Sequence, residues 1–384
     1  ALEKVNLHRR IALSILKFTG THADGIILGF MLSTALMSMW ISNTASTVVM
    51  LPIAVSVISL LISDEDGFTQ KDKNFSLAIM LGIAFSANIG GMATLVGTPP
   101  NSVMLGFLQN QYGIDIGFFQ WMKMGLPFAL ILLSLTYFFL VKVFYPNHLG
   151  QLKSSDGIID QELNKLGAMK KEEKLVLAIF IITATLWMGK SQLMYLFPDL
   201  ALSDTSISML AAVSLFIIPF DWRERKFALG WEDTQKLPWG ILILFGGGLA
   251  LAAGLSQVGL IDRIGSYISS KENWSPLMVS SVLIFLMLFM TELMGNVALV
   301  TILVPLVMGI AQGMEVPVLE MVIPVTLASS CAFMLPMSTP PNAIVFASGH
   351  IKVHEMARIG IFLNLASVLI LIAWAYFVIP YLFS

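Results

Sequence analysis

The spacing of charged residues is the feature that most limits what this chain can fold into. Residues 25–63 and 74–114 contain no Asp, Glu, Lys or Arg, and residues 273–314 contain a single one, Glu292. A helix needs about 20 apolar residues to cross the hydrocarbon core of a bilayer. Each of these three runs is therefore long enough for two passes. Shorter uncharged runs occupy residues 124–141, 175–189, 205–220, 237–261, 321–351 and 359–384.

Composition points to an integral membrane protein. Of the 384 residues, 57% are hydrophobic and 12% are charged, whereas soluble domains carry about 25% charged residues. The formal net charge of −2 offers no basic surface for nucleic acid. These values argue against a soluble enzyme, a nucleic-acid-binding protein and a disordered chain. The apolar runs do not alternate with period two, so an all-α polytopic fold is predicted rather than a membrane barrel.

The positions of Lys and Arg predict how the chain is oriented. The first 17 residues, ALEKVNLHRRIALSILK, are basic and amphipathic, which is typical of a helix lying in the membrane interface. Lys and Arg also gather in residues 146–174 and 221–236, and such segments stay in the cytoplasm. If each membrane pass takes the chain to the other side, counting from these segments places the N-terminal helix on the cytoplasmic side and the C-terminus outside. The predicted location is the inner or plasma membrane of the cell.

One arrangement of motifs occurs twice. Two of the long runs, 25–63 and 273–314, share this arrangement. Asn43 lies near the middle of the first and Asn296 near the middle of the second, each followed at the same spacing by a proline. Downstream of the first run the sequence reads Thr-Pro-Pro-Asn at residues 98–101, and downstream of the second it reads the same at residues 339–342. By the charge count the first hairpin enters the membrane from inside and the second from outside. This order predicts an inverted repeat, the architecture of secondary transporters.

The paired prolines predict two broken membrane helices. Proline lacks a backbone donor and disfavours helix in the residue before it. Backbone groups freed at membrane depth are tolerated where they line a cavity or bind something. Their carbonyl oxygens suit a hard cation such as Na⁺, and helix N-termini with side-chain amides suit an anion. Ser, Thr, Asn and Gly in membrane helices also serve simply to pack helices, but the same order occurring twice favours a binding site.

The motifs resemble those of the divalent anion/sodium symporter family, which includes sodium-coupled dicarboxylate, citrate and sulfate carriers. Ser42-Asn43-Thr44 matches the first of that family's two Ser-Asn-Thr motifs. The family's C-terminal signature also appears, with Ser329-Ser330, Phe333, Pro336-Met337-Ser338 and Asn342-Ala343-Ile344-Val345. The resemblance implies two re-entrant helical hairpins and an elevator-type transporter. It also implies a dimeric scaffold, of which the family's first helices would precede residue 1 and be absent here.

The resemblance divides the chain into four parts. Both repeats would belong to a transport domain that slides against the scaffold, and the scaffold would form a homodimer. The predicted parts are an interfacial helix at residues 1–23, a first repeat at 24–146, scaffold helices with a cytoplasmic linker at 147–274 and a second repeat at 275–384.

The same resemblance implies which residues bind the transported species. A first sodium site would use Ser38, Ser42, Asn43 and the backbone of Gly91. A second would use Thr291, Met294 and Ser338 through backbone or hydroxyl oxygens, with the side chain of Asn296. The substrate carboxylates would be bound by residues of both hairpin tips and both breaks, namely Ser42, Asn43, Thr44, Thr98, Pro99, Gly295, Asn296, Val297, Thr339 and Pro340.

The second hairpin departs from the family pattern. Its motif reads Gly295-Asn296-Val297, so two hydroxyl groups are absent from one end of the predicted site. Each lost hydrogen bond to a charged group is worth about 1.5–3 kcal/mol, which leaves open which anion is carried. Glu292 lies in the same hairpin, and an intramembrane acid is a functional candidate. It would carry a proton, tune a cation site, or bond backbone amides near the hairpin entrance.

The predicted function is sodium-coupled symport of C4-dicarboxylates such as succinate, malate and fumarate. Moving a dianion inward against about 100 mV costs about 2 × 2.3 kcal/mol, so at least two coupled Na⁺ ions are expected. The alternatives are symport of citrate or sulfate, a proton-coupled carrier, and sodium-independent exchange on the same fold. A membrane enzyme would need His, Glu or Asp residues clustered at membrane depth, and Glu292 is the only candidate that the sequence offers. A channel would not explain hairpins and breaks that converge on a closed centre.

Overall fold

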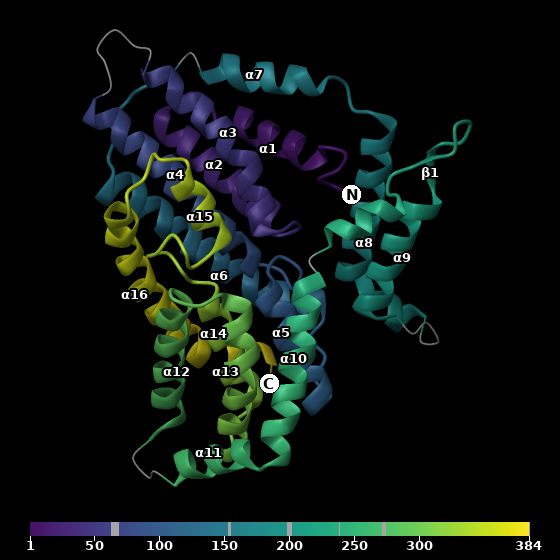
Figure 1. Cartoon of the computed structure of the whole chain (residues 1–384), viewed down its shortest axis with the longest axis vertical. Helices are drawn as coiled ribbons and strands as arrows, with labels where there is room; N and C mark the ends of the chain where they lie inside the picture. The colour runs from purple at the N-terminus through teal and green to yellow at the C-terminus, as the bar shows by residue number, and fades with distance from the viewer. Residues whose placement is uncertain (63–68, 153–154, 198–201, 238, 271–273, 384) are drawn as a thin grey trace.

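The computed structural model describes residues 1–62, 69–152, 155–197, 202–237, 239–270 and 274–383. Helices dominate these residues, and the charge-free runs become helices as the sequence predicts (Figure 1). The run 25–63 forms α2 (Ala23–Ser38) and α3 (Asn43–Ile62), and the run 74–114 forms α4 (Gln70–Met92) and α5 (Pro99–Tyr112). Both interruptions fall at the motifs that the sequence singles out.

The second half of the chain repeats this order of helices. The run 273–314 forms α12 (Pro276–Thr291) and α13 (Asn296–Gly313). The next run forms α14 (Val318–Ser329) and α15 (Pro340–Ala347), and the last forms α16 (Val353–Phe377) and α17 (Ile379–Phe383). The helices are therefore broken before both Pro-Pro pairs, since α5 begins at Pro99 and α15 at Pro340. Proline is well placed there, because the first turn of a helix has no use for its missing N–H.

The remaining elements precede or connect these two sets. They are α1 (Leu7–Phe18), α6 (Phe118–Phe138) with the π-helical turn η1 (Phe139–Phe144), α7 (Ser155–Leu166), α8 (Lys171–Leu196), α9 (Asp204–Ile217), the antiparallel strands β1 (Pro219–Asp221) and β2 (Lys226–Phe227), the 3₁₀ turn η2 (Trp231–Lys236), α10 (Trp239–Gln257) and α11 (Leu260–Ser269).

Helix lengths fit a multi-pass membrane protein. In the described parts of the chain, five helices are long and apolar enough to cross a membrane, namely α4, the continuous helix Phe118–Phe144, α8, α13 and α16. By contrast, α2 and α12 have 16 residues each, which is about 24 Å at 1.5 Å per residue. That is shorter than the roughly 30 Å hydrocarbon core. Re-entrant hairpins are compatible with these lengths and remain a prediction, as does the inverted topology.

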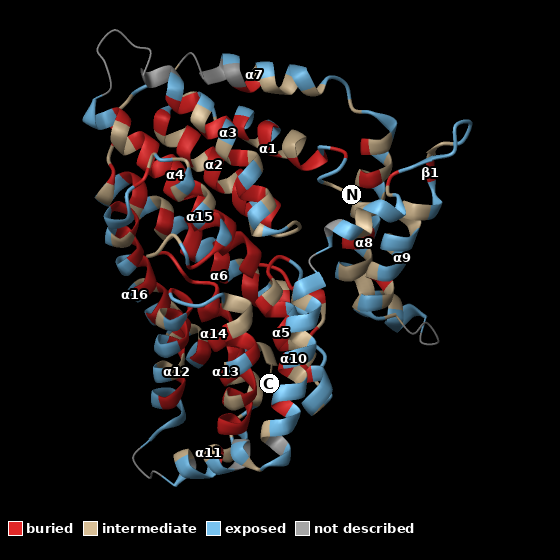
Figure 2. Ribbon diagram, in the orientation of Figure 1, coloured by how far each residue is buried: buried red, intermediate tan, exposed pale blue. Residues whose placement is uncertain are grey.

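Helix α4 forms the centre of the molecule. It is buried from Phe75 to Met92, and Figure 2 shows it among the other buried helices of the N-terminal half. Helix α2 packs closely on it at Gly90, where an added Cβ would come within 2.2 Å of the Ala35 carbonyl oxygen. A side chain at this position would push the two helices apart. The hairpin and the broken helix of the first half are thus held as one packed unit.

The basic N-terminal helix α1 lies against the segment predicted as the cytoplasmic linker. Its apolar residues Leu13 and Leu16 are buried, and α1 packs on α2. Its basic residues form ion pairs with α7 and the start of α8, namely Arg9–Glu162, Arg10–Glu173 at 2.7 Å and Lys17–Asp160 at 2.8 Å. A hydrogen bond from Lys165, with the nearby charge of Arg9, lowers the pKa of Glu162. Two of the segments that the charge distribution predicts to be cytoplasmic are therefore in direct contact, and the side of the membrane on which they lie stays a prediction.

The part of the chain from α8 to α11, which is predicted to be the scaffold, has fewer buried side chains than the helices around α4. Figure 1 shows α8, α9 and the β1–β2 hairpin to one side of the α2–α6 helices, while α10 lies beside α13 and α11 crosses the end of α13. Apolar side chains on α9 and α10 point outward, and Leu210 and Ile243 are 64% and 76% exposed. Exposed apolar surface of this extent is expected where lipid or another protein chain covers a membrane protein.

Candidate functional site

The tip of the first hairpin is joined to α4 by a buried hydroxyl. Helix α2 ends at Ser38, whose Oγ donates to the Ala87 carbonyl oxygen at 2.6 Å. Helix α3 begins at Asn43, and the Oγ of Ser42 accepts the Ala45 N–H at 3.2 Å. Ser42 thus caps α3, a role that serine commonly takes. Ser42 and Thr44 are exposed at the tip, whereas Ser38 is fully buried.

The amide of Asn43 lies directly against Gly91. An added Cβ at Gly91 would come within 2.5 Å of the Asn43 amide. In the amide orientation that satisfies its hydrogen bonds, Nδ2 donates to the carbonyl oxygens of Ala87 at 3.1 Å and Gly97 at 3.3 Å, beside Ser38 Oγ. The structure therefore brings together Ser38, Asn43 and Gly91, three of the four residues of the predicted first sodium site.

The first helix break adds further backbone oxygens at the same place. Gly97 lies close to the carbonyl oxygens of Gly91 and Ser38. A Cβ added at Gly97 would lie 2.5 Å from the first oxygen and 2.9 Å from the second. Thr94 ties the break to the hairpin, since its Oγ1 donates to the Met39 carbonyl oxygen at 2.6 Å. Asn101 in turn donates to the Thr94 carbonyl oxygen at 2.8 Å. Oxygen atoms gathered in this way are the ligands that hard cations prefer.

The second hairpin is joined to α14 by the equivalent bond. Thr291 ends α12, is fully buried, and donates from Oγ1 to the Ser329 carbonyl oxygen at 2.8 Å. Asn296 begins α13, and its Oδ1 accepts the Val297 N–H at 2.8 Å. Gly295 caps this helix without a side chain, and no atom lies within 4 Å of an added Cβ there. Met294 is 40% exposed at the tip, so its side chain contributes little to a closed site.

Glu292 fixes the second break to the hairpin. Its Oε1 accepts the N–H groups of Phe333 at 2.8 Å and Met334 at 2.9 Å, and Oε2 accepts that of Leu335 at 3.0 Å. The amide of Asn364 on α16 donates to Oε1 at 2.6 Å. The carboxylate is buried, at 3% exposure. Of the roles open from the sequence, bonding of backbone amides is the one that this geometry displays.

Asn342 organises the second break from the other side. Its Nδ2 donates to the carbonyl oxygens of Ala332 at 3.1 Å and Leu335 at 3.2 Å, and to Ser338 Oγ at 3.1 Å. Ser338 is buried and its own Oγ donates to the Leu335 carbonyl oxygen at 2.7 Å. Thr339 caps α15 by accepting the Asn342 N–H at 3.4 Å. Ser338 and Thr339 thus lie beside this cluster of oxygens, and their predicted roles in binding Na⁺ and substrate stay predictions.

The two halves pack into each other. Helix α3 of the first hairpin contacts α15 of the second break, and α13 of the second hairpin contacts α5 of the first break. A hydrogen bond of 3.0 Å from Asn88 to Thr339 also joins α4 to α15. All four motif segments therefore belong to one packed region, in which Thr98 is buried and Pro99 and Pro340 begin the short helices.

Sequence reasoning assigned no role in the site to several polar groups of this region. The hydroxyl of Thr94, the backbone carbonyl of Ala87 and the side-chain amide of Asn342 lie in or beside the predicted breaks, and their contacts depend on the folded backbone. Asn364 gave a usable signal, because it is a polar residue in the long uncharged run after Arg358 and polar residues in such helices are seldom without a role. Among the described residues, no cluster of three or more His, Cys, Asp or Glu side chains is arranged to hold a metal ion.

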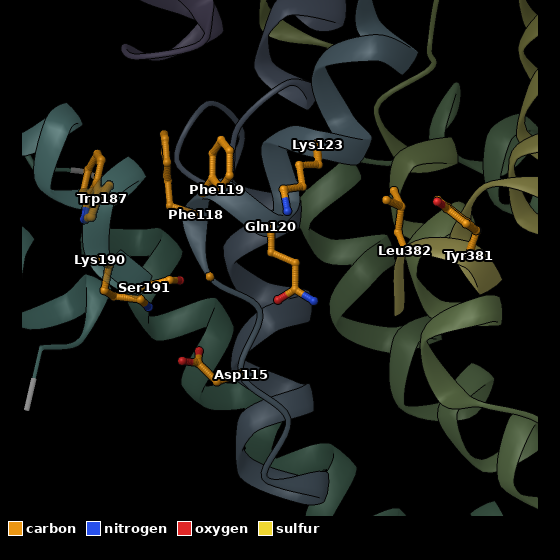
Figure 3. A pocket seen from close by; sticks show the side chains of 11 residues that line it. Asp115, Phe118, Phe119, Gln120, Lys123, Trp187, Lys190, Ser191, Tyr381 and Leu382 are labelled. Carbon is orange, nitrogen blue, oxygen red and sulfur yellow. The ribbon is translucent and has the colours of Figure 1, made fainter. Parts of the chain in front are cut away.

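A cavity of about 570 Å³ lies outside the motif region. Figure 3 shows Gln120 and Lys123 on one side of it and Lys190 and Trp187 on the other. It contains none of the predicted site residues, and Lys190 is paired with Asp204 at 2.8 Å. Its neighbour is the first hairpin tip, since the ring of Trp40 stacks on Phe118 with centroids 5.7 Å apart.

Comparison with known proteins relates the whole chain to one family. The sequence profile described as the sodium:sulfate symporter transmembrane region matches residues 1–383. The sodium-dependent dicarboxylate transporter SdcS of Staphylococcus saprophyticus is 37% identical over 385 residues, covering 99% of this chain and 74% of the relative. The protein of the same name from Staphylococcus aureus strain USA300 is 37% identical over 384 residues, with the same two coverages.

Proposed function

Because the chain belongs to the sodium:sulfate symporter family, we propose that it is a sodium-coupled carrier of C4-dicarboxylates such as succinate, malate and fumarate. Its relatives are named as sodium-dependent dicarboxylate transporters and match nearly its whole length. The observation that carries the proposal is the pair of oxygen clusters, each formed where a hairpin tip meets a broken helix. In carriers built from inverted repeats, the substrate and coupling-ion sites lie where the repeats meet and are formed by broken helices.

We assign one Na⁺ ion to each cluster. The first ion would be bound by Ser38, Ser42, Asn43 and the Gly91 carbonyl, and the second by Thr291, Met294, Asn296 and Ser338. The Ser38–Ala87 and Thr291–Ser329 hydrogen bonds support the pairing, since each brings a hydroxyl of a hairpin to a carbonyl of a broken helix. Both sites use oxygen ligands that Na⁺ accepts without a carboxylate.

The substrate would bind between the two clusters. Its carboxylates would meet Ser42, Asn43 and Thr44 at one tip and Gly295, Asn296 and Val297 at the other. Thr98 with Pro99 and Thr339 with Pro340 would flank it, where the positive ends of α5 and α15 favour an anion. The described residues of these segments include no Lys or Arg, so co-bound Na⁺ would neutralise the dianion.

Coupling to Na⁺ follows from the energetics of import. Two Na⁺ ions cancel the charge of a dicarboxylate, and a third makes its entry favourable under the membrane potential. We therefore propose at least two ions per substrate. The carrier would work in the cell membrane as a homodimer through its scaffold, and the two hairpins with their broken helices would move together as an elevator.

The second hairpin favours one alternative for the substrate. Gly295 and Val297 provide no hydroxyl where the first tip has Ser42 and Thr44. A less polar pocket at this end suits a bulkier anion, so citrate is the second candidate, with sulfate symport and sodium-independent exchange as the remaining ones.

Uptake by reconstituted protein tests the proposal. Radiolabelled succinate is offered to proteoliposomes under an inward Na⁺ gradient or an equal K⁺ gradient, with unlabelled succinate, citrate and sulfate as competitors. Uptake that requires Na⁺, with succinate as the strongest competitor of its own transport, is the expected result. Uptake that ignores Na⁺ and is driven by internal dicarboxylate would replace symport by exchange.

A further inference from the structure

Asn88 is the side chain that joins the two helix breaks. It lies on α4 of the first half and is 2% exposed. Its Nδ2 donates to Thr339 Oγ1 at 3.0 Å and to Asn342 Oδ1 at 3.4 Å, both at the start of α15 in the second half. Buried amides seldom form such long-range bonds without structural consequence, because each lost partner leaves a buried polar group unsatisfied.

On the α15 side, the partner of Asn88 is the residue that organises the second break. Asn342 is fully buried, and its amide nitrogen donates to two carbonyl oxygens of the break and to Ser338 Oγ. Its Oδ1 accepts from Asn88. The amide plane of Asn342 is therefore fixed from both ends, so a shift of Asn88 moves the group that holds Ser338 in place.

On the α4 side, Asn88 belongs to the helical turn that builds the first cluster. The preceding residue, Ala87, provides the carbonyl oxygen that accepts from Ser38 Oγ at 2.6 Å. Gly91, one turn further along, supports the amide of Asn43. In an α-helix each backbone N–H bonds to the carbonyl oxygen four residues earlier, so neighbouring turns are tied together. Any adjustment of the first cluster on binding an ion is thus passed to Asn88.

The first half provides this bridging side chain, and the second half provides none at the matching position. Ser329 stands at the position of α14 that corresponds to Asn88 when the two Thr-Pro-Pro-Asn motifs are aligned, and its Oγ bonds within its own helix, to the Thr326 carbonyl oxygen at 2.6 Å. Thr98 Oγ1 and Asn101 Oδ1 correspond to the two atoms that accept from Asn88. In the part of the chain that the structure describes, both are buried and lack a hydrogen-bond partner. The second break is therefore tied to the first by a side chain that has no counterpart.

We propose that Asn88 is a positioning residue that couples the two cation sites, so that an ion in the first site orders the break that forms the second. The inference rests on the proposed function, because it presumes one Na⁺ ion at each cluster. It predicts cooperative sodium binding that depends on an amide touching neither ion nor substrate. When two sites are linked through one ordered element, a ligand bound at one site changes the affinity of the other by the same factor in both directions.

The test measures sodium cooperativity in Asn88→Ala and in Asn88→Asp. The aspartate keeps the size of the side chain but cannot donate to Asn342 Oδ1. Ser86→Ala is the matched control, since Ser86 is buried on the same helix and its Oγ has no partner among the described residues. Succinate uptake into proteoliposomes is recorded against Na⁺ concentration, and the melting temperature of the purified protein is recorded over the same Na⁺ series without succinate.

The expected result is a Hill coefficient for Na⁺ that is the same in the unaltered protein and in Ser86→Ala and lower in both Asn88 variants, where only the need for both ions in transport keeps uptake sigmoidal. The Na⁺ concentration for half-maximal uptake should rise about fivefold or more, the lower end of typical coupling between sites, while the rate at saturating Na⁺ is kept. If Asn88→Ala does not fold, Asn88→Asp decides the question alone.

Two outcomes separate this inference from the proposed function. An unchanged Hill coefficient in the Asn88 variants, with sodium-dependent uptake intact, would overturn the coupling role and leave symport standing. Absence of any Na⁺ effect on uptake and melting temperature in the unaltered protein would overturn both.

Discussion

The two halves of the site share a framework and differ at the tips. In each half a hydroxyl at the end of the first hairpin helix donates to a carbonyl of the broken helix, as Ser38 does to Ala87 and Thr291 to Ser329. In each half an asparagine of the Thr-Pro-Pro-Asn motif donates back to the break, from Asn101 to the Thr94 carbonyl oxygen and from Asn342 to that of Leu335.

Glycine brings the following helix onto each break in the same manner. An added Cβ at Gly125 of α6 would lie 2.8 Å from the Met92 carbonyl oxygen, and one at Gly360 of α16 would lie 2.3 Å from that of Phe333. Backbone oxygens thus face a closely packed helix in both halves. This matched framework is what two related cation sites require, because it depends little on side chains that can be substituted.

The tips show what has diverged. Asn43 is packed against Gly91 and bonded to two carbonyl oxygens, whereas the bond described for the Asn296 side chain goes to its own neighbour, Val297. Ser42 caps its helix with its hydroxyl group, whereas the N-cap residue Gly295 has no side chain to do so. The second half has instead a buried carboxylate, Glu292, that receives four N–H donors. The comparison teaches that the first tip is fixed by its own packing and the second by Glu292.

Replacing the two asparagines should have the largest effect and should separate the halves. Asn43→Ala and Asn296→Ala are both expected to abolish succinate uptake, since each removes a proposed ligand of Na⁺ and substrate. Only Asn43→Ala should also lower the melting temperature, because only its amide is bonded into the fold, at about 0.5–1.5 kcal/mol per hydrogen bond. Uptake assays and thermal unfolding of the purified variants provide the two readouts.

Ser56→Ala is the control for these variants, since Ser56 is exposed on α3 and bonds within its own helix. Normal transport by either asparagine variant would remove that residue from the site. Equal loss of stability in both variants would contradict the difference drawn between the tips.

Glu292→Gln should weaken the hydrogen bonds that join the second hairpin to the second break. The new amide nitrogen would face backbone N–H groups that need an acceptor, and bonds to a charged group are worth about 1.5–3 kcal/mol each. We expect a fall in stability of roughly that size and a higher Na⁺ requirement, measured by thermal unfolding and by Na⁺-dependent uptake. Asn364→Ala, which removes one of the four donors, should act in the same direction more weakly. A fully active and equally stable Glu292→Gln protein would show that the break holds its shape without the carboxylate.

Adding a methyl group should harm the first half more than the second. At Gly97 it would lie 2.5 Å from the Gly91 carbonyl oxygen, whereas at Gly295 no atom lies within 4 Å. Overpacking typically costs 1–3 kcal/mol, so Gly97→Ala should lower both the melting temperature and sodium affinity. Gly295→Ala, its matched partner, should leave stability within about 0.5 kcal/mol of the original. Similar behaviour of the two variants would mean that the first cluster is no more tightly packed than the second.

Restoring the Ser-Asn-Thr motif should have the smallest effect. Gly295→Ser has room, and serine is favoured at a helix N-cap. Combined with Val297→Thr, it should shift the relative competition by succinate and citrate severalfold, because an added hydrogen bond to a carboxylate, worth about 1.5–3 kcal/mol, acts on both anions and only the difference changes their ranking. Competition for labelled succinate measures the shift. An unchanged ranking would show that these hydroxyl groups do not select the anion.

Much of the fold could be predicted because long runs without charged residues identify membrane helices. The uncharged runs became helices, and the double prolines placed both helix breaks correctly. Ion pairs such as Arg10–Glu173 join the two basic segments that the charge pattern put on the same side. The helices and the breaks were predictable because each depends on local chemistry that the bilayer or the backbone imposes, whereas the side of the membrane stays a prediction.

The contacts within the site were harder to predict. The motif match suggested Ser38, Asn43 and Gly91 as neighbours, but the bonds of Glu292 to Phe333, Met334 and Leu335 join residues far apart in sequence. Nothing in residue spacing shows which backbone N–H groups a broken helix leaves free. Asn88 was visible as a polar residue before the first break, yet its partners on α15 depend on how the two halves pack.

The most direct test of the account is whether succinate binds only together with Na⁺ and only when both tips are intact. The melting temperature of the purified protein is measured with and without succinate, in NaCl or in an equal concentration of KCl, for the unaltered protein, Asn43→Ala and Asn296→Ala. Ligand at about 100 times its Kd stabilises a protein by about 2.7 kcal/mol. The account predicts a clear rise with succinate in NaCl for the unaltered protein, and none in KCl or in either variant. An equal rise in KCl, or a full rise in either variant, would contradict it.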